Sequence, residues 1–381
     1  MDQAGLDLLS AAYPSNFEDL RRRGDTERFL RGEVYARENV RAYLEKAAEG
    51  LLERAGRAAR EADWFAVAEE KARLDVMAAR YEAAVDTQGI NRLFQDYVLS
   101  QFGKLSQNIH PSSPVLVSKA LDYMHSRSDR FVVVVMDGMS EFDWHILSAS
   151  FAGLNYEKTS MFAMIPSTTS VSRQCLLSGK YPRQLAAPWE QSREKAEFVE
   201  GMGRLGYAQA QIGYARGYDA QFSPFLACGA VIINDVDTIV HAQRQGRLGM
   251  LNNIAVLANQ KRLLHMTERF VSAGFDVYIT ADHGNTPCTG LGRLMHTGVE
   301  VETRGRRMLV LKDFADKEGL MRKYGLLEYP KYYLPREYDY LICDAGTSFD
   351  AKGEDVMTHG GMTLDEVVVP FITIKAVERN G

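Results

Sequence analysis

The chain has 381 residues, of which 46% are hydrophobic and 25% are charged, a composition typical of a globular protein with a sizeable core. Its formal net charge of -5 argues against tight, sequence-independent binding to duplex DNA. The longest uninterrupted apolar run, residues 131–136, is too short to span a bilayer, and the N-terminus lacks a signal-peptide pattern, so we expect a cytoplasmic protein without membrane association.

Residues 1–105 are predicted to form an α-helical N-terminal region. From residue 27 onward this region is rich in Ala, Glu, Arg and Leu, lacks proline, and repeats apolar residues at spacings of three and four. Its mixed charges are typical of solvated helix faces, and a surface that docks a protein partner is the alternative. The segment 106–114, SQNIHPSSP, contains two prolines and predicts a linker.

After residue 115 the sequence changes to apolar runs that alternate with helical patterns. The runs are FVVVVM (131–136), SMFAMI (160–165), AQIGYA (210–215), GAVII (229–233), FDVYIT (275–280), RRMLVL (306–311) and VVVPFITI (367–374). Continuous β-branched runs indicate strands that are covered on both faces, as in a mostly parallel sheet. We therefore predict an α/β fold, a mostly parallel sheet sandwiched by helices, preceded by the helical region.

The stretch MIPSTTSVSRQCLLSGKYP, residues 164–182, is rich in hydroxyl groups between Ser167 and Ser172. It predicts the end of a strand, a turn at Pro166 and a helix that begins near Ser170. The start of a helix exposes unpaired N–H groups and binds anions readily. A hydroxyl-rich helix cap without chemistry is the alternative.

Acidic residues follow three of the predicted strands. Asp137 follows the run 131–136, Asp235 and Asp237 follow 229–233, and Asp282 follows 275–280 together with His283. Ligands of open α/β sheets bind beyond the carboxyl ends of the strands, where these side chains are expected to meet. A single aspartate in such a place is usually a turn former, but three strand ends favour a site.

Histidines complete a set of metal ligands. Asp237 and His241 are four residues apart and would share one helix face, whereas Asp235 is a rival without this spacing. His359 precedes two glycines, which allow the backbone to approach an ion closely. The combined set is too large for one tetrahedral zinc and predicts two adjacent metals, to one of which Thr169 would bind as an alkoxide. Its carboxylates and imidazoles are Asp137, Asp237, His241, Asp282, His283 and His359.

The order of these residues resembles that of the alkaline phosphatase superfamily. Within it, VVVVMDGMS (132–140), IPSTTSVSRQCLLSGKYP (165–182) and THGGMTLDEVVVPFI (358–372) are most similar to the PglZ family. That family is known from bacteriophage exclusion (BREX) systems and from response regulators of type IX secretion. The resemblance covers residues 130–375 and implies an alkaline phosphatase-like catalytic domain at 115–381, with a cap insertion at about 286–358.

The resemblance also implies individual roles. The family's P-x-x-T pattern, matched through Pro166, puts the nucleophile at Thr169 rather than Thr168, and Arg173 would contact a phosphoryl oxygen. Two zinc ions are implied, with manganese as the alternative metal. One zinc would be held by Asp137, Thr169, Asp282 and His283, and the other by Asp237, His241 and His359.

These features together predict a phosphodiesterase that acts on nucleotides or oligonucleotides in bacterial phage defence. A phosphomonoesterase is the nearest alternative, and a metal-bearing, non-catalytic subunit of a defence or signalling complex, docked through the helical region, is another. A sulfatase is disfavoured because a threonine cannot be converted to formylglycine. In the insertion, the arginines between 304 and 307 and nearby tyrosines would grip a nucleotide, or would belong to a plain β-hairpin.

Overall fold

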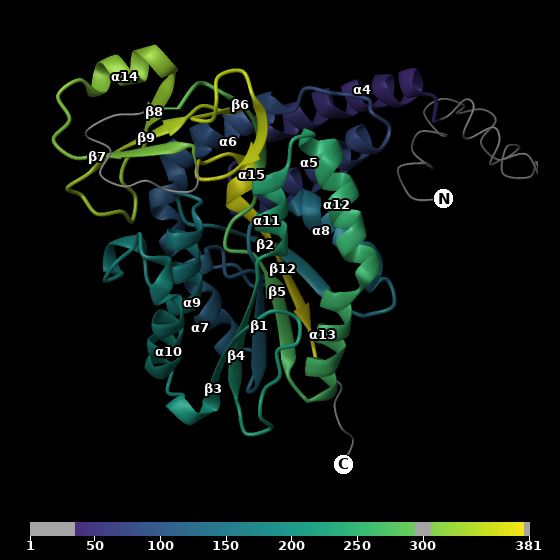
Figure 1. The fold of residues 1–381 in the computed structure, drawn as a ribbon, viewed down its shortest axis with the longest axis vertical. Coiled ribbons are helices and arrows are strands. Elements are labelled where there is room, and N and C mark those ends of the chain that lie inside the picture. Colours follow the sequence, from purple (N-terminus) through teal and green to yellow (C-terminus); the bar gives the residue numbers. More distant parts are fainter. Residues whose placement is uncertain (1–34, 294–305, 377–381) are drawn as a thin grey trace, which may run out of the picture.

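The computed structural model describes residues 35–293 and 306–376 (Figure 1). Six strands form the central sheet in the order β2-β12-β5-β1-β4-β3. Their bounds are β1 Phe131–Met136, β2 Glu157–Phe162, β3 Ile212–Arg216, β4 Cys228–Ile233, β5 Asp276–Thr280 and β12 Val368–Ile374.

The central sheet is mostly parallel, as the sequence predicts. Strand β1 pairs in parallel with β4 and β5, and β3 pairs in parallel with β4. Only β12 runs the other way in this sheet, antiparallel to both β5 and β2. Every residue of β1 and of β4 is buried, which explains their continuous apolar runs, because both faces of these strands are covered.

Helices cover both faces of the sheet (Figure 1). Helices α7, α9 and α10 lie on one side, and α8, α12 and α13 lie on the other together with α5 of the helical region. The bounds are α7 Ala120–His125, α8 Glu141–Leu147, α9 Gln174–Ser178, α10 Glu194–Arg204, α11 Asp235–Ala242, α12 Gly246–Gln260, α13 Arg262–Ser272 and α15 Leu364–Val367. Within the described part of the chain, no helix combines the length and apolar character needed to cross a membrane.

Three helices form the described part of the helical region: α4 Arg37–Ala55, α5 Glu61–Arg80 and α6 Gln88–Gln101. The part of the predicted region before residue 35 lies outside the described residues. Phe65 of α5 and Phe94 of α6 pack against Phe162 of β2, with ring centroids 4.9 and 6.0 Å apart. One core cluster therefore extends from α4 to β12, while the boundaries 1–105, 106–114 and 115–381 stay predictions.

The predicted insertion at 286–358 contains two small sheets of three strands each. One has the order β10-β6-β11 and the other β7-β9-β8, which has a small core of its own around Leu309 and Leu341. The bounds are β6 Thr286–Gly290, β7 Met308–Leu311, α14 Lys317–Tyr324, β8 Leu326–Glu328, β9 Asp339–Cys343, β10 Thr347–Ser348 and β11 Asp355–Thr358.

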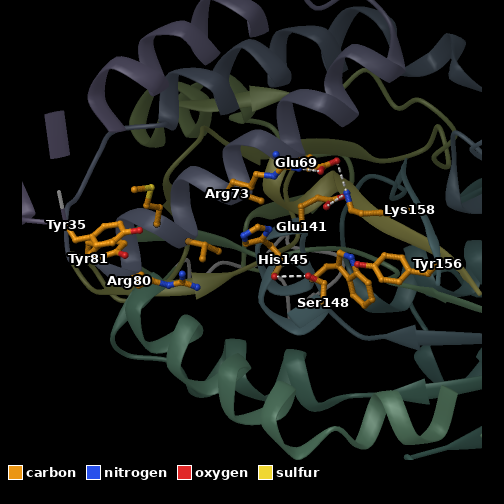
Figure 2. A pocket seen from close by; sticks show the side chains of 14 residues that line it. Tyr35, Glu69, Arg73, Arg80, Tyr81, Glu141, His145, Ser148, Tyr156 and Lys158 are labelled. Carbon is orange, nitrogen blue, oxygen red and sulfur yellow. Dashed lines mark hydrogen bonds and ion pairs between the residues drawn. The ribbon is translucent and has the colours of Figure 1, made fainter. Parts of the chain in front are cut away.

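A cavity of about 410 Å³ lies between the helical region and the sheet (Figure 2). Arg73 comes from α5, and His145 and Lys158 come from α8 and β2. Lys158 is paired with Glu69 and Glu141, at 3.2 and 2.9 Å. The cavity is lined by none of the predicted metal ligands, so it is separate from the site described below.

A buried ion network joins the helical region to the C-terminal part of the fold. The Lys71 ammonium of α5 donates to the Asp75 carboxylate at 2.7 Å and to the Asp365 carboxylate at 2.8 Å. Burial lowers the pKa of Lys71, but the charges of Asp365 and Asp75 outweigh it and raise that pKa above its ordinary value. The network is therefore charged, and its ions compensate one another.

We expect Lys71→Met to destabilise the chain by about 3 kcal/mol, because the buried carboxylates of Asp365 and Asp75 lose their closest shared cation and keep only the longer ion pairs with Arg247. Urea unfolding followed by circular dichroism measures the change. Arg73→Met on the same helix is the control, since its pair with Glu69 is solvent-exposed and contributes less than about 1 kcal/mol. Equal stability of the two variants would contradict this role of the network.

Candidate metal centre

The parallel register brings three strand ends to the same edge of the sheet. Met136 of β1 lies opposite Ile233 of β4, and Val135 lies opposite Thr280 of β5. The residues that follow these strands consequently emerge side by side, where open α/β sheets bind their ligands. Asp137, the start of α11, and the Asp282-His283 pair all lie at this edge.

The first group of candidate ligands contains Asp137, Asp282 and His283, all of them buried. One ligand atom from each lies within 4.8 Å of the others. The Thr169 hydroxyl oxygen lies 3.0 Å from His283 Nε2 and 3.4 Å from Asp137 Oδ1. The structure thus brings together the four residues that the resemblance assigns to one zinc, and their role as ligands stays a prediction.

The second group contains Asp237, His241 and His359, again within 4.8 Å of one another. Asp237 and His241 lie one turn apart on α11, and His241 Nε2 is 3.3 Å from Asp237 Oδ1. His359, just after β11, places its Nε2 3.5 Å from the same oxygen and 3.4 Å from His241 Nε2. Asp235 lies instead beside Tyr218, where its charge adds to burial in raising the pKa of the phenol.

The two groups adjoin each other. The His283 and His359 rings stack with centroids 4.1 Å apart and an interplanar angle of 16°. The Asp237 N–H donates to the Asp137 carbonyl oxygen at 3.0 Å. Gly138, between the strand and this contact, has φ of +75°, a conformation that side chains other than glycine rarely adopt. The arrangement suits a pair of neighbouring ions.

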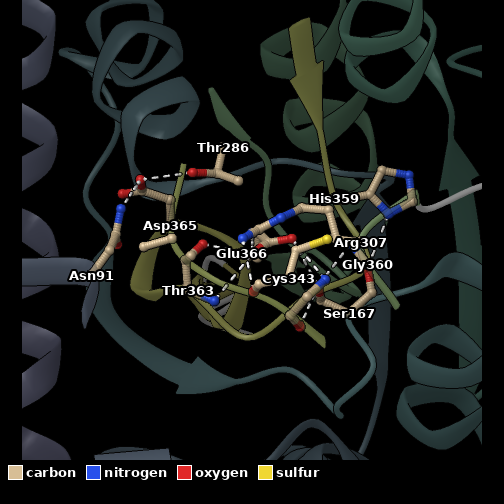
Figure 3. Close-up of polar contacts among 12 residues, drawn as sticks. Asn91, Ser167, Thr286, Arg307, Cys343, His359, Gly360, Thr363, Asp365 and Glu366 are labelled. Carbon is tan, nitrogen blue, oxygen red and sulfur yellow. Dashed lines mark hydrogen bonds and ion pairs between the residues drawn. The ribbon is translucent and has the colours of Figure 1, made fainter. Parts of the chain in front are cut away.

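The chemistry of the donor atoms fits divalent cations. Asp237 Oδ1 and Asp282 Oδ2 are buried and accept no hydrogen bond within the described residues. His359 Nδ1 donates to the Ser167 carbonyl and His283 Nδ1 to the Gly284 carbonyl, both at 3.0 Å (Figure 3 shows the former). The Nε2 atoms therefore present their lone pairs to the two groups. Oxygen and imidazole donors without a thiolate suit zinc or manganese.

A protein-family model supports this interpretation. The BREX system PglZ alkaline phosphatase-like domain matches residues 227–374. This segment is therefore similar to the PglZ family. It contains Asp237, His241, Asp282, His283 and His359, whereas Asp137 and Thr169 precede it in the chain. The match to a PglZ domain supports a phosphoesterase.

The solved structures that are similar to the chain share little sequence identity with it. Murine ectonucleotide pyrophosphatase/phosphodiesterase 5 is 12% identical, covering 64% of this chain and 88% of that protein, with a TM-score of 0.42. The human protein of the same name is 14% identical, with coverages of 64% and 87% and a TM-score of 0.44. Phosphonoacetate hydrolase from Sinorhizobium meliloti 1021 is 12% identical, with coverages of 66% and 91% and a TM-score of 0.41. No curated protein matches the chain. The assignment of residues 227–374 accordingly depends on the PglZ match.

Burial disfavours the charged forms of the side chains at this site. Burial and the neighbouring charge of Asp137 raise the pKa of the Asp282 carboxyl to about 7. Burial and the positive charge of His283 lower the pKa of His359 to about 3. Burial also opposes charge on His283, but the carboxylates of Asp282 and Asp137 raise its pKa overall. A bound cation would favour ionised carboxylates and neutral imidazoles, the forms in which both coordinate.

Arg173 lies behind Asp137 and is fully buried. Its Nη1 is 2.7 Å from Asp137 Oδ2, and its Nε donates to Glu194 at 2.6 Å. Arg173 thus holds one oxygen of the Asp137 carboxylate, and Thr169 lies nearer the other. Arg173 Nη2 has no hydrogen-bond partner among the described residues. The contact of Arg173 with a phosphoryl oxygen stays a prediction, and Nη2 is the atom that would make it.

Several residues that shape the centre were missed in the sequence. Ser167, Asn285 and Glu366 hold the loops that carry the ligands; for example, the Asn285 amide donates to the Gly138 carbonyl oxygen at 2.9 Å. The Thr363-x-x-Glu366 spacing of a capping box was the available signal for the last of them. Arg307, expected to grip a nucleotide, is instead fully buried, and Arg304 lies outside the described residues.

We expect Asp237→Ala to remove one metal from the chain, because it deletes the carboxylate that both histidines of the second group face. Asp235→Ala, two residues away on the same helix, should keep both metals. Elemental analysis of protein purified without chelator measures the stoichiometry. The reverse pattern would show that Asp235 is the ligand.

Proposed function

We propose that the chain is a phosphodiesterase that acts on nucleotides or oligonucleotides, with Thr169 as its nucleophile and two zinc ions as cofactors. The observation that carries this proposal is the place of the Thr169 hydroxyl, 3.0 Å from His283 Nε2 and 3.4 Å from Asp137 Oδ1. A hydroxyl so close to a carboxylate and an imidazole can be deprotonated when a cation binds them. The matched PglZ domain is named for the BREX system, which supports a role in phage defence.

The turn that carries Thr169 is held in place by its neighbours. The Ser172 N–H donates to the Thr168 carbonyl oxygen at 2.9 Å, so the chain turns directly around Thr169. The Ser172 hydroxyl donates to the Asp282 carbonyl oxygen at 2.5 Å, which ties the turn to the end of β5. The nucleophile and the first group of ligands are thereby held in one rigid unit.

The proposed reaction has two steps. In the first, the Thr169 oxygen forms a bond to phosphorus and the bond from phosphorus to the leaving alkoxide breaks. The hydroxyl proton of Thr169 is balanced by the proton that the leaving alkoxide takes up, and threonine is left esterified to the phosphoryl group that still carries the other alcohol. In the second, water attacks that phosphorus, the bond from phosphorus to the Thr169 oxygen breaks, and one proton of the water restores the hydroxyl while a phosphomonoester is released. Divalent cations held by the two groups would neutralise the phosphoryl charge and lower the pKa of the attacking hydroxyl. Asp137 and His283 orient the hydroxyl in both steps.

We expect Thr169→Ala to abolish turnover while both metals remain bound, because Asp137, Asp282 and His283 still form the first group. Loss of the nucleophile removes the covalent route and should lower kcat by more than about 1000-fold. The assay is hydrolysis of a chromogenic phosphodiester with added zinc. The metal content of the same samples shows whether the site is intact.

Thr168→Ala is the matched control for this variant. The Thr168 hydroxyl is buried and has no hydrogen-bond partner among the described residues, so its loss should change kcat by less than about 3-fold. If Thr169→Ala retains the parent activity, Thr169 is not the nucleophile. If Thr168→Ala is the inactive variant, the nucleophile has been assigned to the wrong hydroxyl.

We expect a phosphodiester to be hydrolysed faster than the matching phosphomonoester. The predicted ligands account for two metals, and no further cluster of candidate ligands occurs within the described residues that would hold a third cation beside a dianionic monoester. Both chromogenic substrates are assayed side by side at equal zinc concentration. Faster monoester hydrolysis would favour the phosphomonoesterase, and metal binding without any hydrolysis would favour the assembly subunit.

A further inference from the structure

Two consecutive carboxylates of the short helix α15 face different parts of the protein (Figure 3). The Asp365 carboxylate faces the helical region, where it accepts from Lys71 at 2.8 Å and from Asn91 at 3.1 Å. The Glu366 carboxylate faces the loops beside the metal centre and is fully buried. Neither residue belongs to the predicted ligands. A buried carboxylate such as that of Glu366 is stable only if hydrogen bonds and opposite charges compensate it.

Every polar contact of the Glu366 side chain comes from a donor. Its Oε1 accepts from the Gly361 N–H at 2.8 Å and from the more distant Ser167 hydroxyl at 3.4 Å. Its Oε2 accepts from the Thr363 N–H at 3.0 Å and from the Thr363 hydroxyl at 2.6 Å. The Arg307 guanidinium pairs with the same oxygen. Both oxygens must therefore be acceptors, which only an ionised carboxylate provides.

Gly361 connects this carboxylate to His359. The Ser167 hydroxyl donates to the Gly361 carbonyl oxygen at 3.0 Å and accepts from the Gly360 N–H at 3.1 Å. His359 Nδ1 in turn donates to the Ser167 carbonyl oxygen at 3.0 Å. The contacts form a continuous chain from Glu366 to the imidazole that faces Asp237 (Figure 3).

Arg307 holds Glu366 from the insertion. It is fully buried just before β7, and its Nε and Nη2 donate to the carbonyl oxygens of Thr347 and Asp344, each at 2.9 Å. A Cβ atom at Gly361 would lie 3.0 Å from Arg307 Nη1 and 3.2 Å from Glu366 Oε2. The second glycine after His359 therefore makes room for the ion pair.

We propose that Arg307 and Glu366 are positioning residues for His359, so that the insertion and the second metal site are coupled through this buried ion pair. The inference goes beyond the proposed function but rests on its two-metal site. It predicts that a change in the pair acts on the metal held by Asp237, His241 and His359. The first group, whose ligands make no side-chain contact with the pair among the described residues, should be left unchanged.

The principal test is Glu366→Gln, measured by competition for zinc with a chromogenic chelator. A glutamine has a single acceptor oxygen, so whichever way its amide is turned, an NH2 group faces a donor. We expect the affinity of one of the two sites to fall by about 10- to 100-fold, the usual cost of disturbing a residue that orients a ligand.

Two backgrounds identify the affected site. In Asp282→Ala, which disrupts the first group, Glu366→Gln should weaken the remaining zinc by the same factor. In Asp237→Ala, which disrupts the second group, it should have no effect on the remaining zinc. Equal weakening in both backgrounds would mean a general structural role and would overturn the inference, as would an unchanged affinity in Asp282→Ala.

Arg306→Gln is the matched control, because Arg306 is the next residue of the chain and pairs with Asp350 within the insertion. It should leave both affinities within about 2-fold of the parent. A parent chain that binds no zinc at all would contradict the proposed function, whereas two parent sites that Glu366→Gln does not change contradict only the positioning role.

Ser167→Ala keeps the test decisive if Glu366→Gln does not fold. It removes one hydroxyl that joins Gly360 and Gly361 and that lies 3.4 Å from Glu366 Oε1, but it leaves the ion pair of Glu366 with Arg307 in place. We expect it to weaken the same site by at least about 3-fold, with a far-ultraviolet circular dichroism spectrum like that of the parent. A folded Ser167→Ala chain with parental affinities would overturn the inference.

Discussion

The structure depends on the approach of three carboxylates at one buried edge of a parallel sheet. Asp137 and Asp282 are almost completely inaccessible, and Asp237 lies next to them through its hydrogen bond to the Asp137 backbone. Like charges held together in a region of low polarity repel, which is seen in the pKa of Asp282, raised to about 7 by burial and by Asp137. Positive charge is needed there, and Arg173 supplies part of it.

An arginine and two histidines surround the carboxylates of the site. Arg173 faces Asp137 from within the fold and is itself paired with Glu194, a second buried carboxylate. The buried imidazoles of His283 and His359 stack and present their Nε2 atoms to different carboxylates. The arginine is permanently charged, whereas the imidazoles would be neutral if they coordinated a metal, so bound cations would then supply the remaining positive charge.

Much of the fold and of the candidate site could be predicted because the deciding signals are local. The buried strand β1 is a continuous apolar run followed at once by Asp137, and the helical spacing of Asp237 and His241 puts both on one face of α11. Asp235 lies in the same segment of sequence but is not four residues from a histidine. In the structure its side chain lies beside Tyr218. Because β1 pairs in parallel with β4 and β5, the residues that follow these three strands meet at one edge of the sheet.

The remaining features could not be predicted because they depend on contacts between distant parts of the chain. Arg307 and Glu366 are 59 residues apart, and Lys71 and Asp365 are 294 apart. In the sequence, Arg307 belongs to a basic cluster that equally suits a nucleotide-binding surface, and only its complete burial decides otherwise. No periodicity distinguishes a buried arginine from an exposed one, since its partner is chosen by tertiary packing.

These distant contacts explain why one core joins the helical region to the sheet. Asp365 is held by Lys71 of α5 and Asn91 of α6, while its neighbour Glu366 is held by Arg307 of the insertion. Both carboxylates lie on the four-residue helix α15, which leads directly into β12 of the central sheet. A shift of either outer part would have to break a buried ion pair, at a cost of several kcal/mol. The outer parts are thus joined to α15, and the loop that precedes this helix carries His359, although neither outer part supplies a candidate ligand within the described residues.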